Sequence, residues 1–320
     1  MMPIDQVDYL IIGGGLAGAN AAVSIRENDK NGTIVIVTDE NYIPYDRVPL
    51  SKNYLLGKMK KDVLYVKKQD FYISEKIQVV SGRKATSLDP KNHTVTIDDG
   101  TEYTYKKLLL ATGGRARKLA IQGSELNGVF YLRTLDDAES IMQAIERSKT
   151  AVVIGGGFIG CEIAATFSKR GIVTTIVEVG PKILGRAFDF DTASWIENYL
   201  QRKGVKIMAK TTPAEIVGNN GKVTGVKLQS GQVIPADFIV IGIGIIPNVE
   251  LAKDAGLQVD NGIMVNEYMQ TSNPDIYAAS DVARFHSPVF GRHMRLEHYD
   301  LAVKTRQVGR REHGRQVQAI

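Results

Sequence analysis

Cysteine is almost absent from this chain: among its 320 residues only Cys161 is a cysteine. One cysteine excludes an internal disulfide and a redox dithiol formed within the chain. We expect Cys161 to be a small packing residue at the start of a helix. The five histidines show no metal-ligand spacing, and no Ser-His-Asp set suggests itself. Neither a metal site nor a catalytic triad is predicted.

Long apolar runs and charge of one sign are also missing. No apolar stretch approaches the roughly 20 residues of a membrane span, and the N-terminus lacks the basic region of a signal peptide. We therefore expect a cytoplasmic protein without a membrane partner. The net charge of +5 comes from dispersed Lys and Arg residues, which does not favour nucleic-acid binding but could steer an acidic protein partner. A composition of 43% hydrophobic and 23% charged residues is typical of a globular chain, long enough for two domains.

A glycine-rich turn occurs twice in this chain. Gly13-Gly14-Gly15-Leu16-Ala17-Gly18 follows the apolar run 9–12, and Gly155-Gly156-Gly157-Phe158-Ile159-Gly160 follows the apolar run 151–154. In a strand-to-helix turn, the first glycine permits the tight bend, the second lets a pyrophosphate approach, and the third lets helix pack on strand. Two such turns predict two bound dinucleotides. The predicted binding residues are Gly13, Gly15, Leu16, Ala17 and Gly18 in the first turn, and Gly155, Gly157, Phe158, Ile159 and Gly160 in the second.

The two halves of the chain also end alike. The apolar runs 108–110 and 238–241, in segments that start at 107 and 237, lead into the glycine-containing segments 111–114 and 242–244, as expected of a central strand that ends at a ligand. Before each run, period-two alternation around a turn predicts a β-meander, at 94–103 and 223–232. The sequence therefore predicts an α/β protein with two Rossmann-like, three-layer ββα dinucleotide-binding domains, each with an inserted β-meander. The first domain, 1–118 and 245–320, is discontinuous around the second, 119–244.

Carboxylates stand near the end of the second apolar strand of each half. Asp39 and Glu40 follow 33–38, and Glu178 follows 173–177. A carboxylate there accepts hydrogen bonds from ribose hydroxyls and repels a 2′-phosphate. If the second half binds a nicotinamide coenzyme, Glu178 favours NADH over NADPH, and nearby Lys182 could soften that preference.

A segment in the first half carries a family resemblance. Pro44-Tyr45-Asp46-Arg47-Val48-Pro49-Leu50-Ser51-Lys52 resembles the PY-x-R-x-PLSK segment of the FAD-dependent pyridine nucleotide oxidoreductases. This is the family of ferredoxin and rubredoxin reductases, which also contains apoptosis-inducing factor and monodehydroascorbate reductase. Further motifs match in the expected order from about residue 7 to 304: 111–113, 131–138, 247–252, 277–283 and 295–300.

The resemblance implies that the first half binds FAD and the second binds NAD(P)H. Arg47 would neutralise the FAD pyrophosphate, Asp281 would bind the ribityl or pyrophosphate region, and Tyr299 would lie near the flavin–nicotinamide contact. The implied FAD-binding set, besides the first glycine turn, is Asp39, Glu40, Arg47, Lys52, Ala85, Ala111, Thr112, Gly113, Asp281 and Tyr299. The implied NAD-binding set, besides the second turn, is Glu178 and Gly244.

Lys52 and Glu162 are the predicted catalytic pair. In similar proteins this lysine and glutamate meet beside the flavin ring, where a cation stabilises the anion produced by hydride transfer. The glutamate would hold the lysine and could orient the nicotinamide amide.

The predicted electron acceptor lies outside the chain. Relatives that reduce disulfides, peroxide or oxygen place cysteines near the flavin, and this chain has none in its first half. A ferredoxin or rubredoxin is the leading acceptor. The alternatives are an NADH oxidase or a quinone or dye reductase without a protein acceptor, and a redox-responsive flavin-binding protein with little turnover. The oligomeric state, monomer or dimer, stays open.

Two features depart from the family pattern. Ser280 stands where relatives have a glycine, and its Cβ could press on FAD or on the backbone that holds it. Residues 305–320 are basic, rich in Gln and without amphipathic period. We expect this tail to be disordered and to arise from a frameshift that replaced the C-terminal domain of the family.

Overall fold

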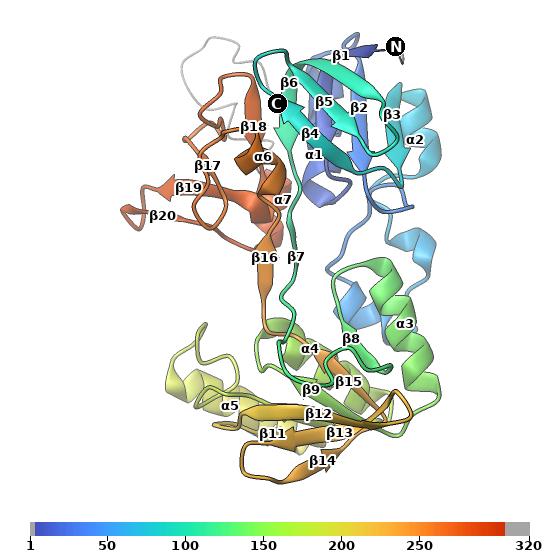
Figure 1. Ribbon diagram of the computed structural model, residues 1–320, viewed down its shortest axis with the longest axis vertical. Helices are drawn as coiled ribbons and strands as arrows, with labels where there is room; N and C mark the ends of the chain where they lie inside the picture. Colours follow the sequence, from blue (N-terminus) through green and yellow to red (C-terminus); the bar gives the residue numbers. More distant parts are fainter. Residues whose placement is uncertain (1–3, 305–320) are drawn as a thin grey trace. The chain divides into compact units, whose positions relative to one another are not determined.

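The computed structural model describes residues 4–304, which form two compact units (Figure 1). Within these residues, unit 1 comprises 4–46, 64–115 and 247–304, and unit 2 comprises 47–63 and 116–246. The segment 47–63 therefore has its contacts in unit 2, although it falls inside the predicted first domain. The functional boundaries near 118 and 245 stay a prediction, and the predicted tail 305–320 lies outside the described residues.

A parallel sheet with the order β3-β2-β1-β6-β18 forms the centre of unit 1. The hairpin of β4 and β5 continues from the first half of β6 in antiparallel pairing. The strands are β1 (Ile4–Ile12), β2 (Ile34–Thr38), β3 (Ile77–Ser81), β4 (Ala85–Asp89), β5 (Thr94–Ile97), β6 (Glu102–Leu110) and β18 (Ile276–Ala278).

Both faces of this sheet are buried, because successive side chains of a strand point to opposite faces. Leu10 and Ile12 of β1 join one core, with the β4–β5 hairpin and residues after 250. Ile11 joins the other core, with side chains of the helices α1, α2 and α7. The remaining elements of unit 1 are α1 (Leu16–Asn28), α2 (Gln69–Ser74), α6 (Glu250–Asp254), β17 (Ile263–Val265), η3 (Ser280–Val282), β19 (Ala283–Ser287), β20 (Arg292–Met294) and α7 (Tyr299–Lys304).

Unit 2 repeats this architecture with a five-stranded parallel sheet and a separate antiparallel sheet. Their orders are β11-β10-β9-β15-β8 and β12-β13-β14. The strands are β8 (Val129–Tyr131), β9 (Thr150–Ile154), β10 (Val173–Val177), β11 (Val205–Met208), β12 (Pro213–Asn219), β13 (Lys222–Leu228), β14 (Val233–Pro235) and β15 (Phe238–Ile241). The helices are η1 (Leu50–Tyr54), η2 (Lys61–Val63), α3 (Leu135–Glu146), α4 (Phe158–Lys169) and α5 (Phe190–Arg202). The chain passes between the units within β7 (Gly114–Ala116) and β16 (Ile245–Pro247).

The two parallel sheets have the same strand order, which confirms the predicted doubled α/β fold with a meander in each half. They differ in where the fifth strand comes from. In unit 2, β8 precedes the glycine turn in the sequence, whereas in unit 1 the corresponding strand, β18, arrives after the chain has built unit 2 (Figure 1).

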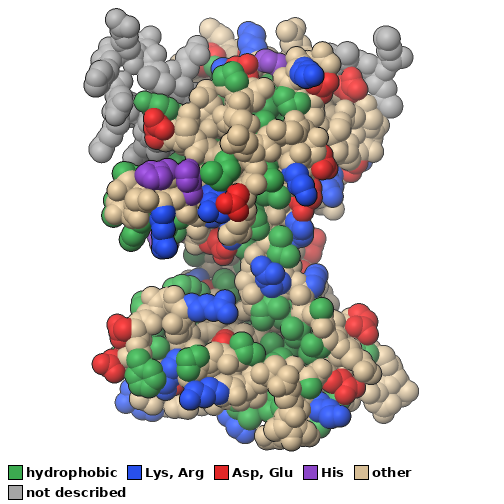
Figure 2. Space-filling view, turned by 60° about the vertical axis from the view of Figure 1, so that its left-hand side comes forward, with side chains coloured by type: hydrophobic (Ala, Val, Ile, Leu, Met, Phe, Trp, Pro, Cys, Tyr) green, Lys and Arg blue, Asp and Glu red, His purple; other side chains and the backbone are tan. Residues whose placement is uncertain are grey.

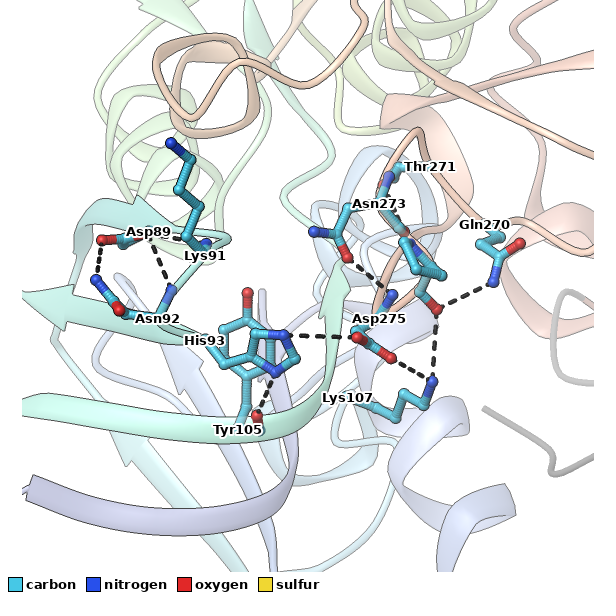
Figure 3. Close-up of polar contacts among 11 residues, drawn as sticks. Asp89, Lys91, Asn92, His93, Tyr105, Lys107, Gln270, Thr271, Asn273 and Asp275 are labelled. Atoms are coloured by element: carbon cyan, nitrogen blue, oxygen red, sulfur yellow. Dashed lines mark hydrogen bonds and ion pairs between the residues drawn. The ribbon is translucent and has the colours of Figure 1, made fainter.

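A polar cluster fixes the returning strand β18 to unit 1 (Figure 3). Asp275, just before β18, accepts from Lys107 Nζ of β6 at 2.6 Å through Oδ1. Its other oxygen, Oδ2, lies 3.5 Å from His93 Nε2, beside the start of β5. The His93 ring stacks on Tyr105, with ring centroids 5.3 Å apart. These contacts join the meander, the central strand and the returning segment of unit 1.

Charged side chains of both signs are interspersed on the face that Figure 2 shows. This agrees with the dispersed Lys and Arg residues of the sequence. Within residues 4–304, no helix is long and apolar enough to cross a membrane.

Candidate functional site

The first glycine turn leaves one open position between crowded ones. A Cβ on Gly13, whose φ is +124°, would lie 2.2 Å from the carbonyl oxygen of Ala111, and a Cβ on Gly18 would lie 2.1 Å from the carbonyl oxygen of Gly13. A Cβ on Gly15 would meet nothing within 4 Å. The crowded glycines therefore pack helix on strand, and the open one leaves space for a ligand at the backbone.

The second glycine turn repeats this geometry. A Cβ on Gly155, at a φ of +107°, would lie 2.4 Å from the Gly242 carbonyl oxygen, and one on Gly160 would lie 1.9 Å from the Gly155 carbonyl oxygen. Gly157 again has nothing within 4 Å. Unit 2 therefore has a second glycine turn with space for a ligand at its backbone. Each of the two turns, 13–18 and 155–160, is called a cradle below.

The helices that start at these turns lack the caps found elsewhere in the chain. Thr134 and Asp189 cap α3 and α5 by accepting backbone N–H groups with their side chains. In α1 and α4 no side chain caps the N-terminus and no acidic residue lies in the first turn. Their first N–H groups and the positive end of the helix dipole are thus available to a phosphate group. This arrangement fits a dinucleotide pyrophosphate at each turn.

Glu178 lies at the second cradle, as its position in the sequence predicted. Its Oε2 accepts the N–H of Gly156 and its Oε1 accepts the N–H of Gly180, each at 2.6 Å. A carboxylate has about four acceptor sites, so both oxygens keep capacity for ribose hydroxyls. The backbone thus fixes the carboxylate beside the glycine turn.

In unit 1, the position that corresponds to Glu178 is occupied by Thr38. The N–H of Gly13 binds the Val37 carbonyl as that of Gly155 binds the Val177 carbonyl, so Thr38 stands where Glu178 does. Asp39 is exposed one residue further on, and Glu40 accepts the Tyr45 hydroxyl at 2.6 Å. The contact of Asp39 and Glu40 with a ribose stays a prediction.

Apolar side chains are exposed around the second turn. Phe158 is 56% exposed and packs edge-on against Phe188, with ring centroids 5.9 Å apart. Ile159, which follows Phe158, and Val179, which follows Glu178, are also exposed. A coenzyme lying along the turn would cover apolar surface here.

Lys182 forms an ion pair with Glu197 of α5, and its ammonium lies over the Phe190 ring at 5.2 Å. The Glu197 side chain is 10% exposed and that of Lys182 is 24% exposed. Because this carboxylate neutralises Lys182, the lysine is tied to α5 and does not offset the charge of Glu178.

The structure brings Lys52 and Glu162 together, inside unit 2. Lys52 lies in η1, Glu162 lies in the first turns of α4, and Lys52 Nζ is 2.7 Å from Glu162 Oε2. Ser51 Oγ donates to the same carboxylate oxygen at 2.5 Å. This serine contact was not predicted, because its partner lies 111 residues away in the sequence.

The segment that carries Lys52 is held onto unit 2 by further contacts, which include the following three. Arg47 Nη1 donates to the carbonyl oxygen of Arg133 at 3.0 Å. Lys61 Nζ binds Glu139 of α3 at 2.9 Å, and Arg170 donates to the carbonyl oxygen of Leu55 at 2.9 Å. The predicted contact of Arg47 with the FAD pyrophosphate stays a prediction.

The predicted turn at 111–113 is joined to a motif 136 residues away. Thr112 Oγ1 donates to the Asn248 carbonyl oxygen at 2.7 Å, and Asn248 Nδ2 donates to the Thr112 carbonyl oxygen at 2.9 Å. Gly113, at a φ of +59°, accepts the N–H of Asn248. Asn248 was not among the predicted site residues, and it fixes the turn that lies against Gly13.

The other predicted FAD residues lie in unit 1, at separate elements. Asp281 is in η3, where its carbonyl oxygen accepts Arg295 Nη1 at 3.0 Å. Ser280 has a φ of +67°, a left-handed conformation that favours the glycine found in relatives. Ala85 begins β4 and is half-buried, and Tyr299 begins α7 and is 47% exposed.

Two remaining positions lie in unit 2. Gly244 has a φ of +97° and open space around it.

Cys161 is buried in α4, and its thiol contacts the Gly156 carbonyl oxygen at 3.5 Å. Burial, reinforced by Glu178, Glu162 and Glu197, raises the pKa of the Cys161 thiol to about 12. A buried, protonated thiol acts as a packing group, as the sequence predicted. Within residues 4–304, no group of three His, Cys, Asp or Glu side chains is arranged to hold a metal ion.

Comparison with known proteins gives the family. A sequence model described as pyridine nucleotide-disulphide oxidoreductase matches residues 7–305. Putidaredoxin reductase CamA of Pseudomonas putida is 40% identical over 295 residues, which are 91% of this chain and 70% of that protein. Rubredoxin-NAD(+) reductase of Pseudomonas putida is 39% identical over 301 residues, 93% of this chain and 78% of that protein.

A solved structure agrees with these relatives. The covalent putidaredoxin reductase–putidaredoxin complex matches with a TM-score of 0.90 and 39% identity, covering 93% of this chain and 73% of that chain. The predicted family, fold, oxidoreductase class and cofactors, FAD and a nicotinamide coenzyme, are confirmed. The chain belongs to the pyridine nucleotide-disulphide oxidoreductase family.

Proposed function

We propose that this chain accepts hydride from NADH on FAD and passes electrons to a small iron–sulfur or rubredoxin-type protein. The observation that carries the proposal is the second open glycine cradle together with the Lys52–Glu162 pair in the same unit. The relatives named for putidaredoxin and rubredoxin support an acceptor of this kind. We also propose that the protein is located in the cytoplasm.

Each cofactor is assigned to the unit whose residues fit it. Unit 1 would hold FAD at Gly13–Gly18, Thr112 and Asp281, and unit 2 would hold the coenzyme at Gly155–Gly160 and Glu178. The backbone-held carboxylate of Glu178 favours ribose hydroxyls over a 2′-phosphate. NADH is therefore the proposed coenzyme.

Lys52 and Glu162 have distinct roles in this proposal. FAD, when bound, supplies a ring that takes up two electrons and releases them one at a time. The ammonium of Lys52 provides positive charge where negative charge develops during hydride transfer. Glu162 keeps that ammonium in place through a contact of 2.7 Å. The buried Cys161 thiol offers no internal acceptor, which favours an acceptor outside the chain.

Anaerobic stopped-flow mixing of the FAD-loaded chain with NADH tests the proposal. We expect rapid bleaching of the flavin absorbance, and a rate at least tenfold lower in Lys52→Met. Lys61→Met is the matched control, because Lys61 lies in the same segment and also pairs with a glutamate. Its bleaching rate should stay within twofold of wild type.

Two results would contradict the proposal. A chain that binds FAD but is not bleached by NADH has only a flavin-binding role. A reduced chain that is reoxidised by oxygen, quinone or dyes, but not by ferredoxin or rubredoxin, lacks the proposed protein acceptor.

A further inference from the structure

One carboxylate oxygen of Glu162 receives both hydrogen bonds that hold this side chain. Ser51 Oγ donates to Oε2 at 2.5 Å, and Lys52 Nζ donates to the same atom at 2.7 Å. No hydrogen bond from the described part of the chain reaches Oε1. The Glu162 side chain is 28% exposed, so Oε1 is an accessible acceptor.

Ser51 is held much more firmly than Lys52. Ser51 is 2% exposed, and its carbonyl oxygen accepts Thr166 Oγ1 at 2.9 Å. Thr166 is buried on α4, one turn after Glu162. The lysine side chain is 43% exposed and long, so it can follow the carboxylate through several rotamers. The short, buried serine side chain cannot.

We infer that Ser51 is a positioning residue that keeps Glu162 Oε1 facing the nicotinamide coenzyme. Its hydroxyl fixes Oε2, so that Oε1 stays available to the carboxamide N–H of the nicotinamide, which requires an acceptor. This inference rests on the proposed function of unit 2 as the coenzyme site. It assigns the recognition of the carboxamide to the hydrogen-bonded pair of Ser51 and Glu162 rather than to the Lys52–Glu162 ion pair alone.

The test compares two coenzymes that differ in the carboxamide. Isothermal titration calorimetry on the FAD-loaded full chain measures the Kd of NAD+ and of its 3-acetylpyridine analogue, in which a methyl ketone replaces the amide and removes its N–H. We expect wild type to prefer NAD+ and Ser51→Ala to lose about tenfold of that preference, the scale of a hydrogen bond to a charged group. Ser51→Thr, which keeps the hydroxyl, should restore it.

Thr166→Val is the matched structural control. It removes a hydrogen bond between the same two segments and leaves both hydrogen bonds of Glu162 in place, so we expect the preference for NAD+ to stay within twofold of wild type. An equal loss of preference in Thr166→Val and Ser51→Ala would overturn the inference, because both variants would then act only by loosening η1 on α4. Ser51→Cys, similar in size with a weaker donor, gives the same test if the alanine variant does not fold, with a partial loss expected.

Glu162→Ala separates this inference from the proposed function. If Glu162→Ala keeps the preference for NAD+, Glu162 does not recognise the carboxamide and the proposed coenzyme contact fails. If Glu162→Ala loses the preference while Ser51→Ala keeps it, the proposed contact stands and the role of Ser51 fails.

Discussion

The glycine turns of units 1 and 2 have the same geometry but different neighbours. Both have three crowded glycines, one open glycine and an uncapped helix. At the end of the adjacent strand, unit 1 has the buried Thr38 and unit 2 has Glu178, fixed by two backbone N–H groups. The backbone cradle for a pyrophosphate is thus duplicated, whereas the side chains that distinguish one dinucleotide from another are not. Binding and selection of the dinucleotide should therefore respond to different substitutions.

The largest effect on stability is expected from substituting the last glycine of each turn, Gly18 or Gly160. A Cβ at Gly18 or Gly160 would lie about 2 Å from a carbonyl oxygen of its own turn, so helix and strand must separate. We expect Gly18→Ala and Gly160→Ala each to lower the free energy of unfolding by about 3 kcal/mol. Gly18→Ala should also lose FAD, and Gly160→Ala should keep FAD but lose reduction by NADH. Chemical denaturation and the flavin spectrum measure these effects.

The open glycines provide the control for this prediction. Gly15→Ala and Gly157→Ala place a Cβ in empty space, so stability without ligand should change by less than about 1 kcal/mol. The affinity for FAD or NADH should nevertheless fall, because the methyl group occupies ligand space. If Gly15→Ala is as unstable as Gly18→Ala, the turn is not divided into packing and binding positions.

The doubled α/β fold and the glycine turns could be predicted from the sequence because both depend on local signals. Apolar runs, positive-φ glycines and turn residues are properties of short segments. The return of the chain to the first domain after residue 245 was predicted, but the pairing of the fifth strand in each sheet was not. β8 and β18 have three residues each, and the contact of Asp275 with Lys107 that places β18 spans 168 residues.

The polar partners of the site also depend on contacts distant in sequence. Ser51 meets Glu162 and Thr112 meets Asn248 across more than 100 residues, and a serine or an asparagine alone carries no signal of its partner. The resemblance predicted Lys52 and Glu162 as a pair, but not the residues that hold them. The segment 47–63 likewise lies with the second unit, because Glu139 and Arg170 bind it there.

The second prediction concerns Glu178, which lies beside the glycine turn of unit 2 and has no counterpart in unit 1. We expect Glu178→Gln to lower kcat/KM for NADH by about 10-fold to 100-fold, because an amide cannot accept the same hydrogen bonds to backbone and ribose. The affinity for FAD should not change. Glu215→Gln in the same unit, which removes a charge from a pair 3.8 Å apart on the antiparallel sheet, should leave kcat/KM within twofold of wild type. An unchanged kcat/KM for NADH in Glu178→Gln would show that ribose selection lies elsewhere.

A third prediction concerns Lys182, which Glu197 neutralises. Glu197→Gln frees the ammonium to attract a 2′-phosphate, so the ratio of kcat/KM for NADPH to that for NADH should rise about threefold, the scale of a partly exposed charge pair. Adding Lys182→Met should return the ratio to the wild-type value. A ratio that stays raised in the double variant would assign the effect to a group other than Lys182.

A fourth prediction concerns Ser280 in unit 1. Its φ of +67° costs an L-residue about 1–2 kcal/mol, so Ser280→Gly should raise stability by about 1 kcal/mol and Tm by about 2–4 °C. Asn220→Gly is the comparison in unit 2, at a φ of +50°. It should have a smaller effect, because asparagine tolerates this conformation. Equal gains from the two substitutions would show that the residue type at Ser280 carries no particular strain.

The smallest predicted effect is on the pH dependence of stability, and it concerns one hydrogen-bonded aspartate in each unit. Asp8 of β1 accepts the N–H of Thr33 at 2.7 Å, and hydrogen bonds from Lys106 and Thr33 lower its pKa to about 2. In unit 2, Asp237 accepts the N–H groups of Lys149 and Thr150, which lower its pKa.

Because the folded pKa of each carboxyl lies below its unfolded value of about 3.9, its stabilisation is present above about pH 4 and is lost as the pH falls towards the folded value. Solvent screening keeps each contribution below about 1 kcal/mol. Urea unfolding of wild type and Asp8→Asn between pH 6 and pH 2.5 should show a difference that shrinks with acidity, and Asp237→Asn should behave alike in unit 2. A difference that stays constant over this range would mean that these contacts do not depend on the carboxylate charge.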